Sequence, residues 1–295
     1  MFWSYIRFII FILSFSLLSA TDLNTIPERG FEYFIREVEL DANISHAMQL
    51  EKIQEFKNNS HSLSPEVAHR LIQLLLDETR SRVYDICLNA ELNPEEIDFV
   101  LTEYDTGIQN IQNMNVDMAW QLLFFVAELK IHRQYVFDFG MALACPRKQL
   151  LRHDLCKLCS IQIEGYARYF RGGKREEDRK EYLAAWEIHQ LEEHHLESYR
   201  IRGFEGFSEE QLQNNMLESA SDLLASTKQR GGGTLINYLI NVFPKKNPHP
   251  RLIPYLEEAL MEAQSLYENN PDGLFKGLPC WNNDVKIVFD RLKES

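Results

Sequence analysis

Residues 115–144 read NVDMAWQLLFFVAELKIHRQYVFDFGMALA, and this stretch decides the fold. It contains no proline, and its large apolar side chains fall on nearly every face of a helix with 3.6 residues per turn. A helix that is apolar all round is buried, and each large side chain buried in this way contributes about 1.5–3 kcal/mol. We therefore predict a central helix over 115–144 that organises the hydrophobic core.

The helical period also dominates on both sides of this segment. Helix start signals recur, among them Ser64-Pro65-Glu66, Asn93-Pro94-Glu95 and a capping box that begins at Ser208. Strand patterns are nearly absent, and most connections have the short lengths found between packed helices. The sequence thus predicts an all-α protein, a bundle of about nine or ten helices around the central one. The predicted helices are 26–57, 65–89, 94–112, 115–144, 147–171, 175–201, 209–229, 234–243, 251–269 and 284–293.

The N-terminal residues 1–20, MFWSYIRFIIFILSFSLLSA, have the pattern of a secretory signal peptide. A single cation, Arg7, precedes an apolar run of about 11 residues, which is shorter than the ~20 that a membrane-spanning helix needs. The run ends in small residues up to Ala20, as a signal peptidase requires. We expect cleavage there, leaving a helical domain over 21–246 and a C-terminal helical extension over 247–295 packed on it. The alternative is a signal anchor that is retained and tethers the protein to a membrane.

Composition limits the classes of function. Hydrophobic residues make up 45% and charged residues 25%, which is typical of a globular protein and excludes a disordered or collagen-like chain. The formal charge of -13 repels phosphate and argues against nucleic acid as a partner. No H-E-x-x-H, G-x-S-x-G, P-loop or G-x-G-x-x-G motif occurs. Together with the predicted signal, these features favour a secreted or otherwise extracytoplasmic, non-catalytic helical protein that binds another protein.

The chain has five cysteines, and Cys145, Cys156 and Cys159 lie close together. In an exported chain this spacing favours a disulfide that joins Cys145 to one of the other two. Buried structural thiols are a plainer alternative. With His153 the three cysteines also form a four-ligand set suited to zinc, and a C-x-x-C pair at the start of a helix can serve redox chemistry. The sequence leaves these interpretations open.

A second candidate metal site consists of His189, Glu192, Glu193 and His195. Glu192 and His195 form the Glu-x-x-His unit found in di-iron four-helix proteins. A second such unit at 66–69 points away from the apolar stripe of its helix, which weakens the di-iron interpretation. We therefore expect no cofactor. The alternative is a secreted metalloprotein or metalloenzyme that holds zinc or two irons at one of these two sites.

Two loops have the composition of anion-binding sites. Arg171, Lys174 and Arg175 surround a Gly-Gly pair, and Gly232 and Gly233 precede a predicted helix start. Cations at the end of a helix and backbone N–H groups at the start of one both attract anions. Ordinary helix termination and a flexible connection explain the same residues, so anion binding is a hypothesis at both loops.

Overall fold

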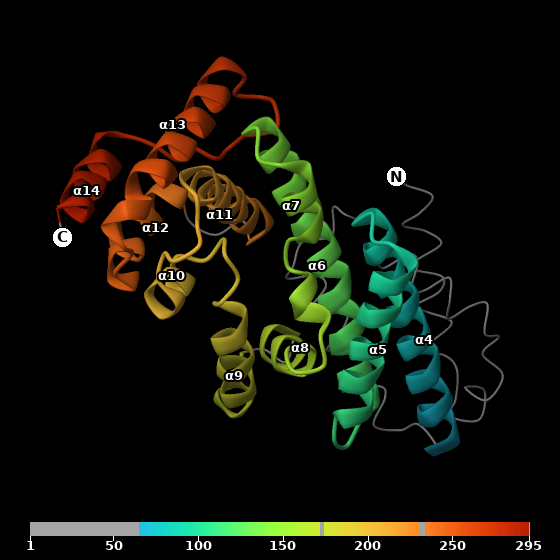
Figure 1. Cartoon of the computed structure of the whole chain (residues 1–295). Coiled ribbons are helices and arrows are strands. Elements are labelled where there is room, and N and C mark those ends of the chain that lie inside the picture. The colour runs from blue at the N-terminus through green and yellow to red at the C-terminus, as the bar shows by residue number, and fades with distance from the viewer. Residues whose placement is uncertain (1–64, 172–173, 231–233, 295) are drawn as a thin grey trace. The chain divides into compact units, whose positions relative to one another are not determined.

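The computed structural model describes residues 65–171, 174–230 and 234–294 (Figure 1). Within these ranges the chain forms eleven α-helices and four short 3-10 helices, with no β-strand. The predicted all-α, multi-helix architecture is therefore confirmed. The expected signal peptide over 1–20 and the predicted helix over 26–57 lie outside the described residues.

The chain divides into two compact units. Described residues 65–78 and 113–120 belong to the first unit, whereas 79–112 and the described residues from 121 onward belong to the second. The candidate site and the main core lie in the second unit.

The helices are α4 Pro65–Asn89, α5 Pro94–Asn110, α6 Val116–Ala142, α7 Arg147–Arg152, η2 Leu155–Leu158, α8 Ile163–Arg171, η3 Glu176–Asp178, α9 Arg179–His189, α10 Leu196–Arg202, α11 Glu209–Arg230, α12 Leu235–Asn241, η4 Phe243–Lys246, η5 Pro250–Leu252, α13 Ile253–Asn269 and α14 Asn283–Lys293.

The main hydrophobic core of the second unit joins the end of α6 to α11 and the helices that follow it. Val136 and Phe139 of α6 are fully buried in the same cluster as Met216 of α11, Leu256 of α13 and Phe289 of α14. Helix α11 packs against α13, and α12 and α13 both pack against α14 (Figure 1). The segment that follows residue 246 thus shares its core with α6 and α11. No helix in the described ranges is both long enough and apolar enough to cross a membrane.

Local start signals explain where several helices begin. Asn93 caps α5 through the backbone N–H of Glu96, whose carboxylate in turn accepts from the backbone N–H of Asn93. Thr234 caps α12, and Asn282 caps α14. These bonds satisfy N–H groups that have no partner inside the helix.

Two predicted continuous helices were wrong, because each is broken in the structure. The segment 147–171 leaves the helical path after α7, where Asp154 adopts a left-handed φ of 60° before η2 and α8. The segment 175–201 ends its helix α9 at His189, turns, and resumes as α10 at Leu196. Both interruptions carry histidines into the same part of the second unit.

Candidate metal centre

Five of the nine histidines gather with two aspartates in the second unit. They come from four separate parts of the chain, namely α6, the turn after α7, the segment from the end of α9 to α10, and α11. The residues are His132, His153, Asp154, His189, His194, His195 and Asp222.

The first set of ligand atoms lies around one ring nitrogen of His132. Its Nε2 lies 3.4 Å from His153 Nε2, 3.4 Å from Asp154 Oδ2 and 3.0 Å from Asp222 Oδ1. His153 Nε2 lies 3.5 Å from Asp154 Oδ2 and 4.0 Å from Asp222 Oδ1. Ligands about 2.1 Å from a metal ion stand about 3.0–3.5 Å apart in octahedral or tetrahedral geometry. These four side chains therefore have nearly the spacing of a formed coordination shell.

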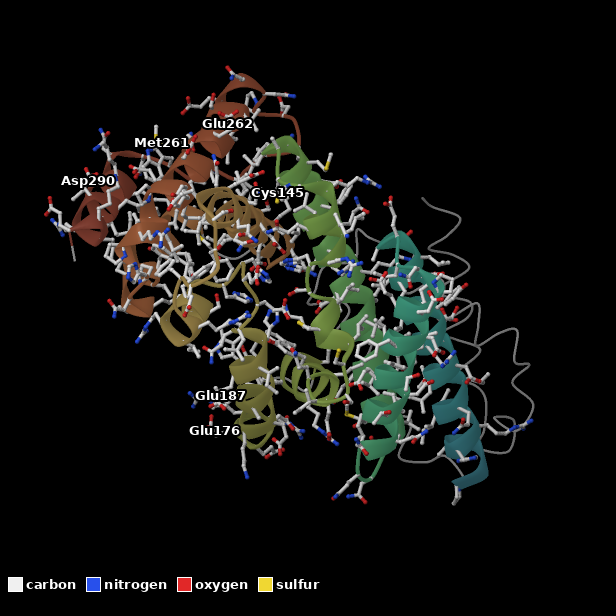
Figure 2. All side chains as sticks on the ribbon, viewed as in Figure 1. Cys145, Glu176, Glu187, Met261, Glu262 and Asp290 are labelled. Atoms are coloured by element: carbon white, nitrogen blue, oxygen red, sulfur yellow. The ribbon has the colours of Figure 1, made fainter. Side chains whose placement is uncertain are left out.

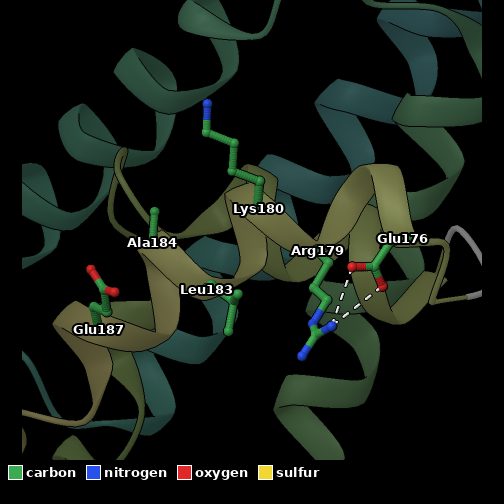
Figure 3. Close-up of a pocket in the computed structure, with 6 residues that line it drawn as sticks. All are labelled: Glu176, Arg179, Lys180, Leu183, Ala184 and Glu187. Atoms are coloured by element: carbon green, nitrogen blue, oxygen red, sulfur yellow. Dashed lines mark hydrogen bonds and ion pairs between the residues drawn. The ribbon is translucent and has the colours of Figure 1, made fainter.

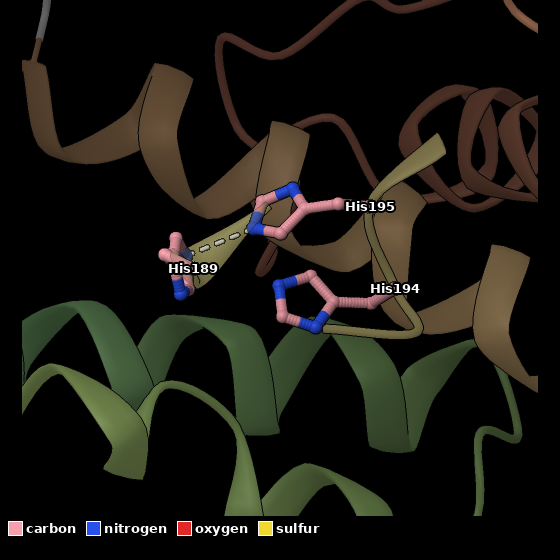
Figure 4. A group of neighbouring side chains, drawn as sticks. All are labelled: His189, His194 and His195. Atoms are coloured by element: carbon pink, nitrogen blue, oxygen red, sulfur yellow. Dashed lines mark hydrogen bonds between the residues drawn. The ribbon is translucent and has the colours of Figure 1, made fainter. Parts of the chain in front are cut away.

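The second set consists of three imidazoles and the other oxygen of Asp154. His189 Nε2 lies 2.8 Å from His195 Nε2 and 3.2 Å from Asp154 Oδ1. One ring nitrogen from each of His189, His194 and His195 lies within 4.8 Å of the other two, and Figure 4 shows the three rings gathered together. Asp154 thus presents Oδ2 to the first set and Oδ1 to the second.

Two buried atoms of the cluster make no hydrogen bond of good geometry, although the first of them lies 3.2 Å from His189 Nε2. They are Asp154 Oδ1 and His194 Nε2, and the side chain of Asp154 is only 1% exposed. A buried polar atom without a partner costs about 1–3 kcal/mol, so native proteins rarely keep one without a reason. A cation bound between these atoms would satisfy both.

The electrostatics favour the metal-binding protonation states at Asp154, His189 and His195. At His153, burial lowers the pKa, but the charges of Asp154 and Glu218 outweigh it and raise that pKa above its ordinary value. Burial alone would raise the pKa of Asp154, but the imidazole of His153 and the ammonium of Lys157 outweigh it and hold that pKa well below its ordinary value. Burial and the charge of Lys157 lower the pKa of His189 to about 2. Burial likewise keeps the pKa of His195 well below its ordinary value. Ionised carboxylates and neutral imidazoles are the forms that coordinate cations.

A second layer of polar side chains orients His153. Its Nδ1 lies 2.8 Å from Glu218 Oε1, and both side chains are almost completely buried. The other carboxylate oxygen of Glu218 accepts from Gln149 Nε2 at 2.6 Å, and Gln149 also donates to Asn215. A carboxylate next to Nδ1 fixes the tautomer that carries its proton on Nδ1. The lone pair of Nε2 is then available to bind a metal ion. The same Oε1 lies 3.5 Å from His194 Nδ1, so Glu218 serves both sets.

A buried arginine holds the turn that carries His153 and Asp154. Arg133, next to His132 on α6, donates from its guanidinium to the carbonyl of His153 and, at 2.6 Å, to that of Leu151. These bonds replace the helical partners that the two carbonyls lose where α7 ends. The left-handed backbone of Asp154 is therefore held by a contact from α6.

The expected disulfide and the cysteine zinc set do not form in the structure. All five cysteines are free thiols. Cys145 follows α6 and faces the carbonyl of Asn214 at 3.7 Å (Figure 2). Cys156 lies 3.2 Å from His189 Nδ1, and of the four predicted zinc ligands only His153 belongs to the cluster. Cys145 and Cys156 therefore have different surroundings.

The structure separates the residues of the other predicted metal set. His189 and His195 join the cluster, but Glu192 and Glu193 are exposed, and Glu193 lies 4.0 Å from Arg202. The reason is that α9 ends at His189, so the residues after it do not keep the helical spacing assumed for a Glu-x-x-His unit.

The three cations of the first predicted anion-binding loop contact other side chains of this chain. Arg171 is buried and pairs with Glu128, and Arg175 pairs with Glu177 and Asp178. Lys174 Nζ lies over the ring of Phe170, 5.7 Å from its centroid. Gly232 and Gly233 lie outside the described residues.

Sequence reasoning missed His132, Asp154, His194, Asp222 and Glu218. One signal was present, since a histidine on a helix that is apolar all round needs a buried polar partner. The His153-Asp154 pair within a predicted helix was another. Neither signal identifies Asp222 and Glu218, which the fold brings in from α11.

A surface hollow on η3 and α9 is separate from the cluster. Figure 3 shows its six lining residues, which include the ion pair of Arg179 with Glu176 at 3.2 Å. Both side chains are largely exposed, and none of the six residues is a candidate metal ligand. We assign no function to this hollow.

Comparison with known proteins identifies one matching family but no activity. A family of unknown function, DUF5662, matches residues 121–263. That segment contains all seven cluster residues and Glu218. No curated protein and no solved structure matches the chain.

Proposed function

We propose that this protein is a metal-dependent hydrolase with two divalent ions held on either side of Asp154. The observation that carries the proposal is the position of this carboxylate, with one oxygen in each set of ligand atoms. Its Oδ1 is buried and makes no hydrogen bond of good geometry, and a bound ion would stabilise it.

The donor atoms favour a particular class of metal. The first set offers two imidazoles and two carboxylates, and the second offers three imidazoles and the shared carboxylate. Imidazole suits zinc, iron, nickel and copper, whereas calcium and magnesium prefer shells made only of oxygen. We therefore expect a first-row transition metal such as zinc, iron, manganese or cobalt.

Paired divalent ions supply an activated water and a clamp for a charged substrate, as in phosphatases and nucleases. Lys157 supports a phosphate ester as that substrate. Its Nζ lies 2.6 Å from Asp154 Oδ2, and its side chain is 17% exposed at the edge of the cluster. An ion that takes Oδ2 competes with this ammonium, which is then available to bind a substrate anion. Asp222, 21% exposed, lies at the accessible edge of the first set.

The sequence favoured an exported, non-catalytic protein that binds another protein, with a metalloprotein as the alternative. The cluster supports the alternative, because binding a partner needs no buried group of five histidines. Three buried or half-buried carboxylates, those of Asp154, Glu218 and Asp222, accompany them, and a bound cation would stabilise their charges. Export and cleavage after Ala20 stay predictions.

The test begins with the metal content of the purified chain. We expect about two divalent ions per chain after reconstitution with zinc, manganese or iron, and almost none in Asp154→Asn, which lacks the shared ligand. His69→Ala removes an exposed histidine outside the cluster and should bind as the wild type does. The loaded protein is then assayed with p-nitrophenyl phosphate and bis(p-nitrophenyl) phosphate, with p-nitrophenyl acetate as the uncharged control.

Two results would contradict the proposal at different levels. A wild-type chain that takes up no metal removes the metal centre altogether. A chain that binds two ions but hydrolyses neither phosphate ester, or hydrolyses them equally well after Asp154→Asn, keeps the metal centre and removes the hydrolytic function.

A further inference from the structure

The thiol of Cys156 lies directly behind one of the candidate ligands. Cys156 is in η2, two residues after Asp154, and its Sγ is 3.2 Å from His189 Nδ1. The opposite nitrogen of the same ring, Nε2, faces Asp154 Oδ1 at 3.2 Å. The imidazole of His189 therefore stands between the thiol and the second set of ligand atoms.

This contact fixes the role of each ring nitrogen once a metal is bound. If Nε2 gives its lone pair to a cation, the single proton of the neutral ring must be on Nδ1. That N–H then donates to the sulfur of Cys156. The thiol occupies for His189 the place that the carboxylate of Glu218 occupies for His153.

The two partners differ in strength. A buried carboxylate accepts a charge-assisted hydrogen bond, whereas a neutral sulfur is a weak acceptor. The stronger partner raises the basicity of its histidine and holds the ring more firmly. The ring of His189 is therefore supported more weakly than the ring of His153, although Glu218 also lies 3.5 Å from His194 Nδ1 in the second set.

We propose that Cys156 is the positioning residue of His189, and that the ion held by His189, His194 and His195 is the weaker bound of the two. The inference rests on the proposed metal centre and adds an order of binding to it. It also gives the C-x-x-C motif a role, through Cys156 alone. Cys159 forms no disulfide with Cys156.

Glu192 extends the same chain of contacts. Burial raises the pKa of the Cys156 thiol, and the charge of the Glu192 carboxylate, which also accepts a hydrogen bond from the thiol, raises it further. The thiol thus accepts from His189 on one side and donates to Glu192 on the other. Donation to Glu192 requires the S–H, which separates this arrangement from a thiolate ligand.

The chain offers a matched control. Cys156 and Cys159 are both half-buried and lie in the same motif, but only Cys156 contacts a candidate ligand. The other three cysteines are buried. Cys156→Ala and Cys159→Ala therefore remove the same atoms from neighbouring positions and differ in the contact with His189.

The experiment is a titration of the metal-free chain with Co²⁺, in which visible absorption reports coordination and a competing chelator sets the free concentration. We expect two steps in the wild type and in Cys159→Ala. His189→Ala should abolish the weaker step, which assigns it. Cys156→Ala should weaken that step about 2–10-fold, as expected for the loss of a neutral hydrogen bond, and leave the tighter step unchanged, while Cys156→Ser, which restores an acceptor, should lie between.

Each outcome decides one question. A wild type that binds no Co²⁺ overturns the metal centre itself. Two wild-type steps with Cys156→Ala equal to Cys159→Ala, or with the tighter step weakened as much as the weaker one, overturn the role of Cys156 alone. Should Cys156→Ala fail to fold, the folded, metal-free Cys159→Ala chain is alkylated with N-ethylmaleimide, and retention of both steps after modification of Cys156 is the contradicting result.

Discussion

Replacing Glu218 by glutamine tests whether the carboxylate behind His153 sets metal affinity. Glu218 uses both oxygens, one 2.8 Å from His153 Nδ1 and the other 2.6 Å from Gln149 Nε2. Glutamine keeps the size of the side chain but has one oxygen and no charge. If that oxygen faces His153, a charge-assisted bond worth about 1.5–3 kcal/mol becomes a neutral one worth about 0.5–1.5. The difference of about 1 kcal/mol corresponds to about a fivefold weaker tighter step.

A graded series makes this reasoning refutable. Glu218→Met has a similar length and no acceptor, so its loss should reach about 10–100-fold. Affinity is measured by competition with a chelator, and Glu210→Gln, an exposed glutamate on the same helix α11, is the control. Glu218→Gln binding as tightly as the wild type, or Glu218→Met binding no more weakly than Glu218→Gln, would refute the assignment.

Three further predictions follow from named contacts. Asp222→Asn removes a ligand from the first set only, so metal analysis should find one ion per chain instead of two. Gly165→Ala would place a Cβ 2.5 Å from the carbonyl oxygen of Glu181, forcing α8 and α9 apart, so thermal unfolding should show a loss of about 1–3 kcal/mol that exceeds the helix-propensity gain. Tyr166→Phe removes a buried hydroxyl that has no hydrogen-bond partner, so denaturant unfolding should show the metal-free chain more stable by about 1 kcal/mol, and an unchanged or lower stability would contradict this.

Helix positions could be predicted wherever local signals decide them. The prediction 65–89 ends with α4 at Asn89, and the prediction 209–229 begins with α11 at Glu209. Proline and a capping side chain mark the starts, and the apolar period marks the lengths. The central helix, predicted over 115–144, is observed as Val116–Ala142 for the same reason.

The candidate site could be predicted only in part. His153, His189 and His195 were selected from the sequence, but they were assigned to two separate sites, because spacing along one helix was the only available guide. The missing ligands are far apart in sequence, from His132 on α6 to Asp222 on α11. No local pattern brings such residues together, since their proximity depends on how α6 and α11 pack in the second unit.

The two broken helices are the link between the fold and the site. Between residues 147 and 171 the apolar period continues through the break, so local propensity favours a helix there. The structure instead holds Asp154 in a left-handed conformation, with Arg133 taking the carbonyls that the helix would have used. Such strain persists only where the surrounding contacts impose it, and it concentrates at functional sites. In this chain the break turns His153 and Asp154 together into the cluster, which a straight helix with 100° between neighbouring side chains would not allow.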